Sequence, residues 1–195
     1  MIIAVASLKG GASKTTTAVH IAAALAARRG AGPVALLDAD ASRAATRWAE
    51  RGPGMPYAVA DITRPPADAE HIVVDTPGAE SAADLVELAR AADRVIIPSP
   101  PSPLDLVGAL DTLELLAGVA DVRVLLTRCP PRPQRDEIEA RALLADEGAR
   151  VLRHAVPNRK PYQAAALHGV TVREVRGGRP LWPVWPRIAR EVIDP

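Results

Sequence analysis

The segment Ser7–Thr17, SLKGGASKTTT, is the strongest indication of the fold. It follows the apolar run Ile2–Ala6 and opens a helical pattern over Lys14–Arg29, so the expected order is strand, loop, helix. Glycines let backbone N–H groups close around phosphate oxygens, and the N-terminus of the following helix adds a favourable dipole. The stretch therefore predicts a phosphate site, in which Lys14 reaches the β- and γ-phosphates and the Thr15 hydroxyl is a ligand of Mg²⁺.

Two positions depart from the ordinary phosphate-loop motif G-x-x-x-x-G-K-[ST]. Leu8 stands at the first glycine position and Ser13 at the second. Taken alone, the loop is also compatible with a glycine-containing turn before a helix with an exposed lysine. A second lysine, Lys9, lies five residues before Lys14, however, and K-G-G-x-x-K-T-T resembles the deviant Walker A motif of the ParA/MinD family of ATPases.

This resemblance implies a P-loop NTPase that binds ATP with Mg²⁺. It also implies that Lys9 crosses a dimer interface to the partner's ATP, so that a homodimer forms on ATP binding, and that Lys9 and Lys14 are catalytic. The residues expected to bind the phosphates are Lys9, Gly10, Gly11, Ala12, Ser13, Lys14, Thr15 and Thr16.

Two carboxylates, Asp38 and Asp40, follow the apolar run Val34–Leu37. Carboxylates at the C-terminal ends of parallel strands line the ligand crevice of an α/β sheet. The pair resembles the D-x-D switch of the family, which implies that Asp40 positions the attacking water and that Asp38 supports Mg²⁺. The family usually continues with Pro-Gln, whereas this chain has Ala41-Ser42. A simpler alternative is that Asp40 or Ser42 caps a helix over 44–51.

A third acidic residue, Asp75, ends the apolar run that begins at His71, and Thr76-Pro77-Gly78 follows. The segment resembles a Walker B strand with its switch. By that match Asp75 binds Mg²⁺, and the small Gly78 lets a backbone N–H approach the γ-phosphate.

Short apolar runs alternate with longer amphipathic ones along the chain, which indicates an α/β fold with a mostly parallel sheet and helices on both faces. One domain over 1–195 is expected. The expected strands are Ile2–Ala6, Val34–Leu37, Ile72–Val74, Val95–Ile97, Val122–Leu126 and Val151–His154. The expected helices are Lys14–Arg29, Ser42–Arg51, Ser81–Ala91, Leu104–Ala117, Arg135–Glu147, Tyr162–Leu167 and Pro186–Ile193.

The resemblance covers residues 2 to about 176. The run V-I-I-P-S-P-P-S-P-L-D over 95–105 resembles a strand and loop of the family. Val124–Arg128 and Val156–Arg159 resemble the segments beside the nucleotide base. Thr127, Pro157 and Asn158 are therefore expected as adenine-side contacts. A turn and a strand end are an equally good account of these residues.

Charge is distributed unevenly. Residues 1–120 carry 10 basic and 14 acidic side chains, and residues 121–195 carry 14 and 9. A basic C-terminal third indicates a polyanion partner, although arginines that only solvate the surface give the same pattern. In small ParA proteins the ATP dimer binds DNA without sequence preference, so the resemblance favours nonspecific DNA as the partner.

Composition excludes several classes of protein. The single cysteine, Cys129, can form neither an intrachain disulfide nor a thiolate metal cage, and it excludes a nitrogenase iron protein, which needs two cysteines per subunit. The N-terminus resembles no signal peptide, and no run of 18 apolar residues is present. We expect a cytoplasmic protein, associated with the nucleoid when ATP is bound. Prolines 180, 183 and 186 argue against a continuous amphipathic helix around Trp182 and Trp185, so these tryptophans are expected to pack inside and no stable membrane association is expected.

The leading hypothesis is a ParA-like ATPase for plasmid or chromosome partition. Its ATP-dependent sandwich dimer would bind DNA, and a ParB-like adaptor would stimulate ATP hydrolysis and release. One alternative is a positioning ATPase for protein cargo, with the same chemistry and another partner. A MinD-like regulator at a membrane and a ligase similar to dethiobiotin synthetase are further alternatives.

Overall fold

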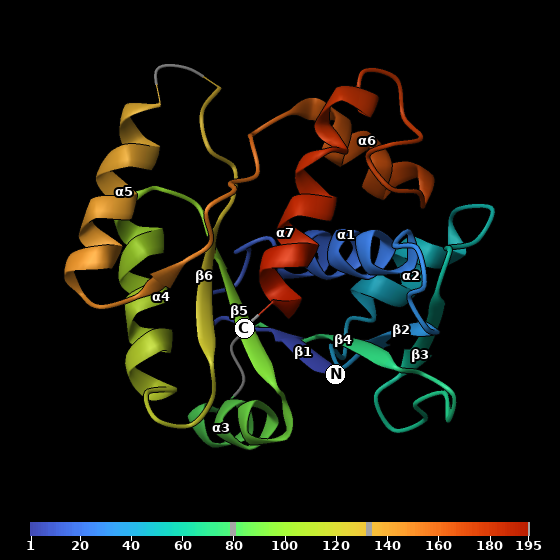
Figure 1. Cartoon of the computed structure of the whole chain (residues 1–195), viewed down its shortest axis with the longest axis horizontal. Coiled ribbons are helices and arrows are strands. Elements are labelled where there is room, and N and C mark those ends of the chain that lie inside the picture. The colour runs from blue at the N-terminus through green and yellow to red at the C-terminus, as the bar shows by residue number, and fades with distance from the viewer. Residues whose placement is uncertain (79–80, 132–133, 195) are drawn as a thin grey trace.

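The computed structural model describes residues 1–78, 81–131 and 134–194. Within them, strands and helices alternate along the chain (Figure 1). The strands are β1 (Ile2–Val5), β2 (Val34–Asp38), β3 (Ala58–Asp61), β4 (His71–Asp75), β5 (Arg94–Ser99), β6 (Val122–Leu126) and β7 (Arg150–Val151). The helices are α1 (Lys14–Ala26), α2 (Ala44–Glu50), α3 (Ala82–Ala91), α4 (Pro103–Leu115), α5 (Arg135–Asp146), α6 (Lys160–His168), the 3₁₀ turn η1 (Arg179–Leu181) and α7 (Val184–Ile193).

The strands form one parallel sheet in the order β3-β2-β4-β1-β5-β6-β7. Strands β2, β3 and β4 lie on one side of β1, and β5, β6 and β7 lie on the other. The direction in which strands are added to the sheet therefore reverses at β1. Ligands of open α/β sheets bind at such a switch point, outside the carboxyl ends of the strands. The register pairs Asp75 with Val5 on one side and with Asp38 on the other, so Asp75 stands beside the end of β1 and Asp38 stands one strand further out.

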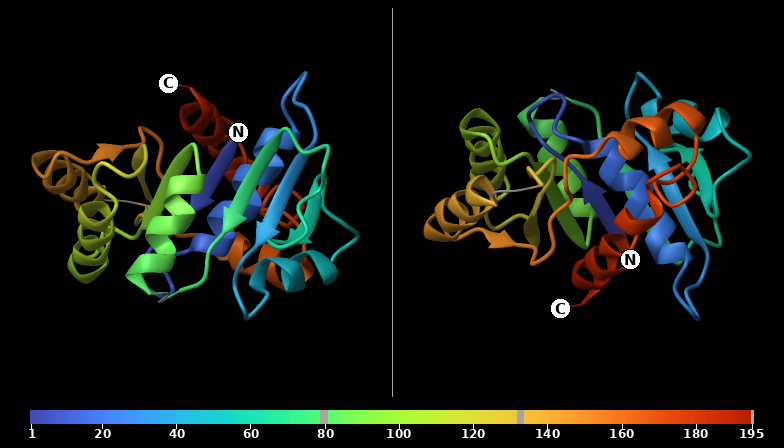
Figure 2. Two further views of the ribbon diagram at one scale, coloured as in Figure 1. Left: turned by 90° about the horizontal axis from the view of Figure 1, so that it is seen from below. Right: turned by 90° about the horizontal axis from the view of Figure 1, so that it is seen from above.

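Both faces of the sheet are covered by helices (Figure 2). Ile3 and Val5 point into one apolar core, which contains residues of α1 and α7, and Ala4 and Ala6 point into the other, with α3, α4 and α5. Because both faces of the strands are buried, the strands are continuous apolar runs rather than alternating patterns. The predicted fold class is confirmed.

The strand predictions differ from the structure at both edges of the sheet, where one strand was missed and another was placed wrongly. The edge strand β3 was not predicted, because its residues are exposed or half-buried and form no apolar run. The strand expected over Val151–His154 is the two-residue β7, and the chain then leaves the sheet, where the N–H of Arg153 donates to the Glu191 carboxylate of α7.

The C-terminal segment packs inside, as predicted. Trp185 of α7 is fully buried against α1. The far end of α7 is held by Arg94, which donates to the carbonyl of Asp194 at 2.9 Å and to the Asp121 carboxylate at 2.7 Å. In the described parts of the chain no helix has the length and apolar character needed to span a membrane.

Candidate nucleotide site

The phosphate loop connects β1 to α1 and is closed around Lys14. This lysine is buried, and its Nζ donates to the backbone carbonyl of Lys9 at 3.3 Å and to that of Ser7 at 3.5 Å. Ser13 has φ +72° and Gly11 has φ +76°, both in the left-handed region. Ser13 thus adopts the backbone conformation for which glycine is favoured, at the position where the ordinary motif has glycine. The serine at this position carries local backbone strain that a glycine would not.

Asp75 lies at the end of β4, beside this loop, and is completely buried. Neither of its carboxylate oxygens has a hydrogen-bond partner among the described residues. Burial raises the pKa of Asp75 to about 7. The charges of Asp38 and Asp40 add to this shift, and the neighbouring Thr15 hydroxyl and Lys14 ammonium oppose it. A buried carboxylate without a partner is costly, and a hard cation that prefers oxygen ligands would remove that cost.

These residues therefore fit Mg²⁺. Among the described residues no group of three or more His, Cys, Asp or Glu side chains is placed to hold a metal ion alone. This agrees with Mg²⁺, which is usually held by one or two carboxylates together with substrate phosphates. Gly78 adjoins the same place, since a Cβ on it would lie 3.4 Å from the Lys14 Nζ and 3.4 Å from the Cα of Gly10.

Asp38 and Asp40 have different surroundings. Oδ2 of Asp38 accepts from the N–H and from the hydroxyl of Thr46, both at 2.8 Å, and its Oδ1 accepts from the N–H of Asp40 at 3.2 Å. Asp40 is half-buried and accepts from the N–H of Ser42 at 2.7 Å. The alternative that Asp40 or Ser42 caps α2 is wrong, because Arg43 is the N-cap residue and Asp38 accepts from an N–H of the first turn.

Lys9 forms an ion pair with Asp105, near the start of α4, within the same chain. Its stem lies against α4, where a Cβ on Gly108 would be 3.3 Å from the Cβ of Lys9. Burial of Asp105 opposes ionisation, but the Lys9 ammonium and the Ser102 hydroxyl hold the pKa of this carboxyl below its usual range. The side chain of Lys9 remains 38% exposed, so it is accessible to another molecule.

The three expected adenine-side residues meet in one cavity of about 460 Å³ next to the phosphate loop. The N–H of Asn158 donates to the carbonyl of Cys129 at 2.7 Å, and that of Cys129 donates to the carbonyl of Val156 at 3.0 Å. These bonds bring two segments far apart in sequence together beyond the end of β6. The cavity is lined by Ser13, Thr16, Thr17, Thr127, Arg128, Val156, Pro157, Asn158, Arg159, Tyr162, Gln163, Ala166 and Trp185.

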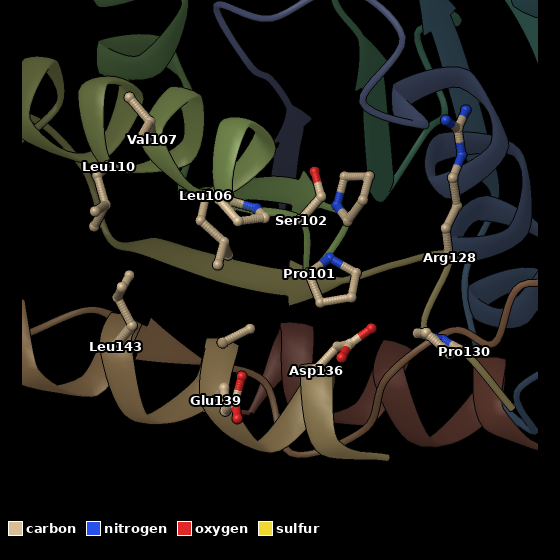
Figure 3. A pocket seen from close by; sticks show the side chains of 13 residues that line it. Pro101, Ser102, Leu106, Val107, Leu110, Arg128, Pro130, Asp136, Glu139 and Leu143 are labelled. Atoms are coloured by element: carbon tan, nitrogen blue, oxygen red, sulfur yellow. The ribbon is translucent and has the colours of Figure 1, made fainter. Parts of the chain in front are cut away.

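A second hollow of about 640 Å³ lies between α4 and α5 (Figure 3). Leu106 and Leu110 on α4 face Leu143 on α5, and Asp136 and Glu139 lie along the α5 side. Arg128 lies at its rim and also lines the 460 Å³ cavity, so the two hollows adjoin. Figure 3 shows the Arg128 guanidinium directed away from Asp136.

Comparison with known proteins agrees with this geometry. A model of the CobQ/CobB/MinD/ParA nucleotide binding domain matches residues 3–172, and the chain belongs to this family. Within it, the chain is similar to the ParA and MinD type of P-loop ATPase.

Two relatives carry the name maintenance of carboxysome distribution protein A. The one from Gloeobacter kilaueensis is 37% identical over 187 residues, which are 90% of this chain and 85% of that protein. The one from Halothiobacillus neapolitanus is 31% identical, over 98% of this chain and 95% of that protein. Protein ParA of Rhizobium radiobacter is 29% identical, over 90% and 86%.

Solved structures show the same fold. The ATP complex of a McdA variant from Cyanothece superposes with a TM-score of 0.78 at 17% identity, covering 98% of this chain and 95% of that chain. The MinC:MinD complex of Aquifex aeolicus gives a TM-score of 0.76 at 18% identity, with the same coverage.

Sequence reasoning missed several residues of the site. It gave Asp105 no role, although an acid at the start of a helix in a chain with a second loop lysine is a usable signal. Nothing in the sequence pointed to the aromatic residues of the base cavity, because Tyr162 and Trp185 reach it from separate helices.

Proposed function

We propose that this protein is an ATPase that positions a protein assembly inside the cell, in place of the DNA cargo favoured by the sequence alone. The observation that carries the ATPase part is the buried Asp75 carboxylate, which has no hydrogen-bond partner among the described residues and lies beside the closed loop around Lys14. The protein-cargo part is supported by the two carboxysome-distribution relatives, which are 37% and 31% identical to the chain.

Each residue of the phosphate end has a distinct task in this proposal. Lys14 and the loop 10–16 bind the phosphates of ATP and neutralise their charge. Thr15 and Asp75 would hold Mg²⁺, which would supply further neutralisation of the phosphate charge. Asp38 would support this place indirectly, because its oxygens are already hydrogen-bonded. Asp40, half-exposed at the mouth of the site, orients the attacking water.

The place of Lys9 supports ATP-dependent dimerisation as part of this proposal. In the single chain its charge is paired with Asp105, and partly exposed ion pairs contribute only about 0.2–1 kcal/mol. The phosphates of a nucleotide in a second copy are a stronger partner, because they carry more negative charge. Lys9 therefore exchanges Asp105 for the second copy's ATP, and this exchange couples nucleotide binding to the dimer.

An adaptor would connect the dimer to its cargo and stimulate hydrolysis. The hollow between α4 and α5 fits an apolar segment with basic side chains, because its apolar walls are bordered by Asp136 and Glu139. Val107, 55% exposed on α4, lines it. We expect Val107→Asp to abolish adaptor-stimulated hydrolysis and to leave basal hydrolysis unchanged. Stimulation that survives this substitution would place the adaptor elsewhere.

Capture of the cargo tests the positioning proposal. The Asp40→Ala variant should stay in the ATP-bound dimer, because without the Asp40 carboxylate it cannot orient the water that hydrolyses ATP. The tagged variant, incubated with host extract and ATP, should retain a protein assembly or its adaptor, and the ADP sample should not. Recovery of a centromere-binding protein with its DNA would instead favour partition.

DNA partition is the second candidate. Its specific support is a set of exposed basic side chains late in the chain, namely Arg153, Arg159, Lys160, Arg173, Arg176, Arg179, Arg187 and Arg190. A gel shift with ATP, ADP and no nucleotide at two salt concentrations measures this property. Binding of arbitrary DNA only with ATP and at low salt would support a nucleoid-bound dimer. Such a dimer is compatible with a protein cargo as well as with a DNA cargo. No binding in any state would remove partition.

A further inference from the structure

Three of the five aromatic residues of the chain gather around one buried histidine. The chain has three Trp, two Tyr and no Phe. His20 of α1 is stacked on Trp185 at a centroid distance of 4.7 Å and an interplanar angle of 26°. Tyr162 and Trp48 meet it edge-on at 5.5 Å and 6.0 Å. The few aromatic side chains of the chain are thus concentrated at one place in the fold.

Two backbone hydrogen bonds fix the orientation of the His20 ring. Its Nδ1 lies 2.7 Å from the carbonyl oxygen of Thr16, and its Nε2 lies 3.0 Å from the backbone nitrogen of Val172. A carbonyl only accepts and a backbone N–H only donates. The ring is therefore neutral, with its proton on Nδ1. It connects the first turn after the phosphate loop to the segment that follows α6.

Tyr162 is held at two points by this cluster. Its ring packs against His20, and its hydroxyl accepts from the Trp185 Nε1 at 3.2 Å. Tyr162, Trp185 and Thr16 all line the 460 Å³ cavity that adjoins the phosphate loop, together with Asn158. An immobilised aromatic ring thus stands in the wall of the cavity where a nucleotide with its phosphates on the loop would place its base.

We propose that Tyr162 contacts the base of the bound nucleotide, and that His20 is its positioning residue. The proposal rests on the proposed ATP site. Phosphates gain nothing from an aromatic wall, whereas a purine base presents a large π-face to it. The hydrogen bonds of His20 and Trp185 keep the Tyr162 ring in place before the nucleotide arrives, so little order has to be gained on binding.

Calorimetric titration with two ligands tests this proposal. Mg·ATP probes the phosphate and base ends together, and Mg·tripolyphosphate probes the phosphate end alone. We expect Tyr162→Leu to lower the affinity for Mg·ATP about tenfold, which is the loss expected for one base–aromatic contact. The affinity for Mg·tripolyphosphate should stay within about twofold of the wild-type value. Tyr162→Phe keeps the ring and should restore most of the affinity for ATP.

His20→Phe keeps a stacked ring and removes both hydrogen bonds. This substitution alone should lower the affinity for Mg·ATP a few-fold. In a protein that already carries Tyr162→Leu it should cause almost no further loss of affinity, because His20 acts through Tyr162. Tyr57→Leu is the matched control. This tyrosine is buried, donates to the carbonyl of Val19 at 3.0 Å and does not line the cavity. It should lower the melting temperature without changing the ratio of the two affinities.

The outcomes are distinguishable. If Tyr162→Leu leaves the ratio of ATP to tripolyphosphate affinity unchanged, Tyr162 does not contact the base and the inference is overturned. If the wild-type protein binds neither ligand, the ATP site itself is wrong. If His20→Phe weakens both ligands equally, in either background, His20 is only structural and its positioning role is overturned.

Discussion

The phosphate end and the base end of the candidate site differ in where their residues come from. The phosphate end is built from one continuous loop and from carboxylates at the ends of two paired strands, Asp38 and Asp75. The base end joins a strand end near Thr127, the segment around Asn158 and two helices through Tyr162 and Trp185. Local sequence determines the first, whereas tertiary packing determines the second.

This difference shows what each end contributes. The phosphate end places charges and backbone donors, and its loop and buried carboxylate are strained or unsatisfied among the described residues. At the base end the ring nitrogens of His20 and the Tyr162 hydroxyl already have hydrogen-bond partners, whereas the buried hydroxyls of Thr17 and Thr127 have none among the described residues. We therefore expect changes at the phosphate end to weaken ligand binding most, and changes at the base end to weaken it less and to lower stability.

The largest effect is expected at Lys14. Lys14→Gln removes a buried cation from the phosphate loop, so we expect Mg·ATP to bind at least about 100-fold more weakly, within the range for a buried charged partner. Isothermal titration measures this loss. Lys160→Gln is the control, because Lys160 is exposed at the start of α6. Equal affinities for the two variants would contradict a phosphate role for Lys14.

Asp75 should make the ligand-free protein less stable as the pH rises from acid to neutral values. Its pKa is raised from an ordinary value of 3.8 to about 7 in the folded protein, so the folded state retains a proton that the unfolded state loses. Stability from this group is therefore lost as the pH rises from about 4 through 7, by up to roughly 4 kcal/mol. Asp75→Asn should be more stable than wild type at pH 7.5 without ligand, but should gain no stability from Mg·ATP. Urea unfolding with and without Mg·ATP measures both, and an Asp75→Asn protein that Mg·ATP still stabilises would exclude Asp75 from the site.

His20 should make the protein sensitive to acid, with the opposite sign. Burial lowers its pKa to about 4, against the opposing hydrogen bond to Thr16, from an ordinary value of 6.5. The stability from the neutral ring is fully present above pH 6.5 and is lost as the pH falls towards 4, by up to roughly 3 kcal/mol. His20→Phe should start less stable at pH 7 and decline less steeply between pH 6.5 and 4.5 in urea unfolding. His168→Ala is the control, because His168 is exposed. The stability of this variant should fall with pH as the stability of the wild type does. Parallel curves for His20→Phe and wild type would refute this assignment.

The smallest effect is expected at Ser13. Ser13→Gly removes the strain of a non-glycine residue at φ +72° and should raise the free energy of unfolding by about 0.5–1 kcal/mol. Affinity for Mg·ATP should change less than threefold. Chemical unfolding and titration check the two values. A destabilised Ser13→Gly protein would mean that the serine side chain stabilises the loop by more than its backbone strain costs.

The phosphate end could be proposed from the sequence because a loop motif and two strand-ending carboxylates lie in short continuous stretches. The structure places Lys14, Asp75 and Gly78 near one another, and their roles stay predictions. The Lys9–Asp105 pair and the aromatic wall were not predicted, since both join residues far apart in the chain. The edge strand β3 was missed because an exposed edge needs no apolar run. The capping alternative for Asp40 failed because Asp38 reaches Thr46 from another element, a contact that local rules do not show.

Sedimentation of the wild type, Lys9→Ala and Asp40→Ala with ATP and with ADP tests whether dimerisation of this protein depends on the bound nucleotide. We predict that Asp40→Ala is a stable dimer with ATP and a monomer with ADP, and that wild type dimerises with ATP until it is hydrolysed. Lys9→Ala should bind ATP but remain a monomer, because the cation that leaves Asp105 for the second copy is missing. A Lys9→Ala protein that dimerises with ATP, or an Asp40→Ala protein that stays monomeric, would contradict the account.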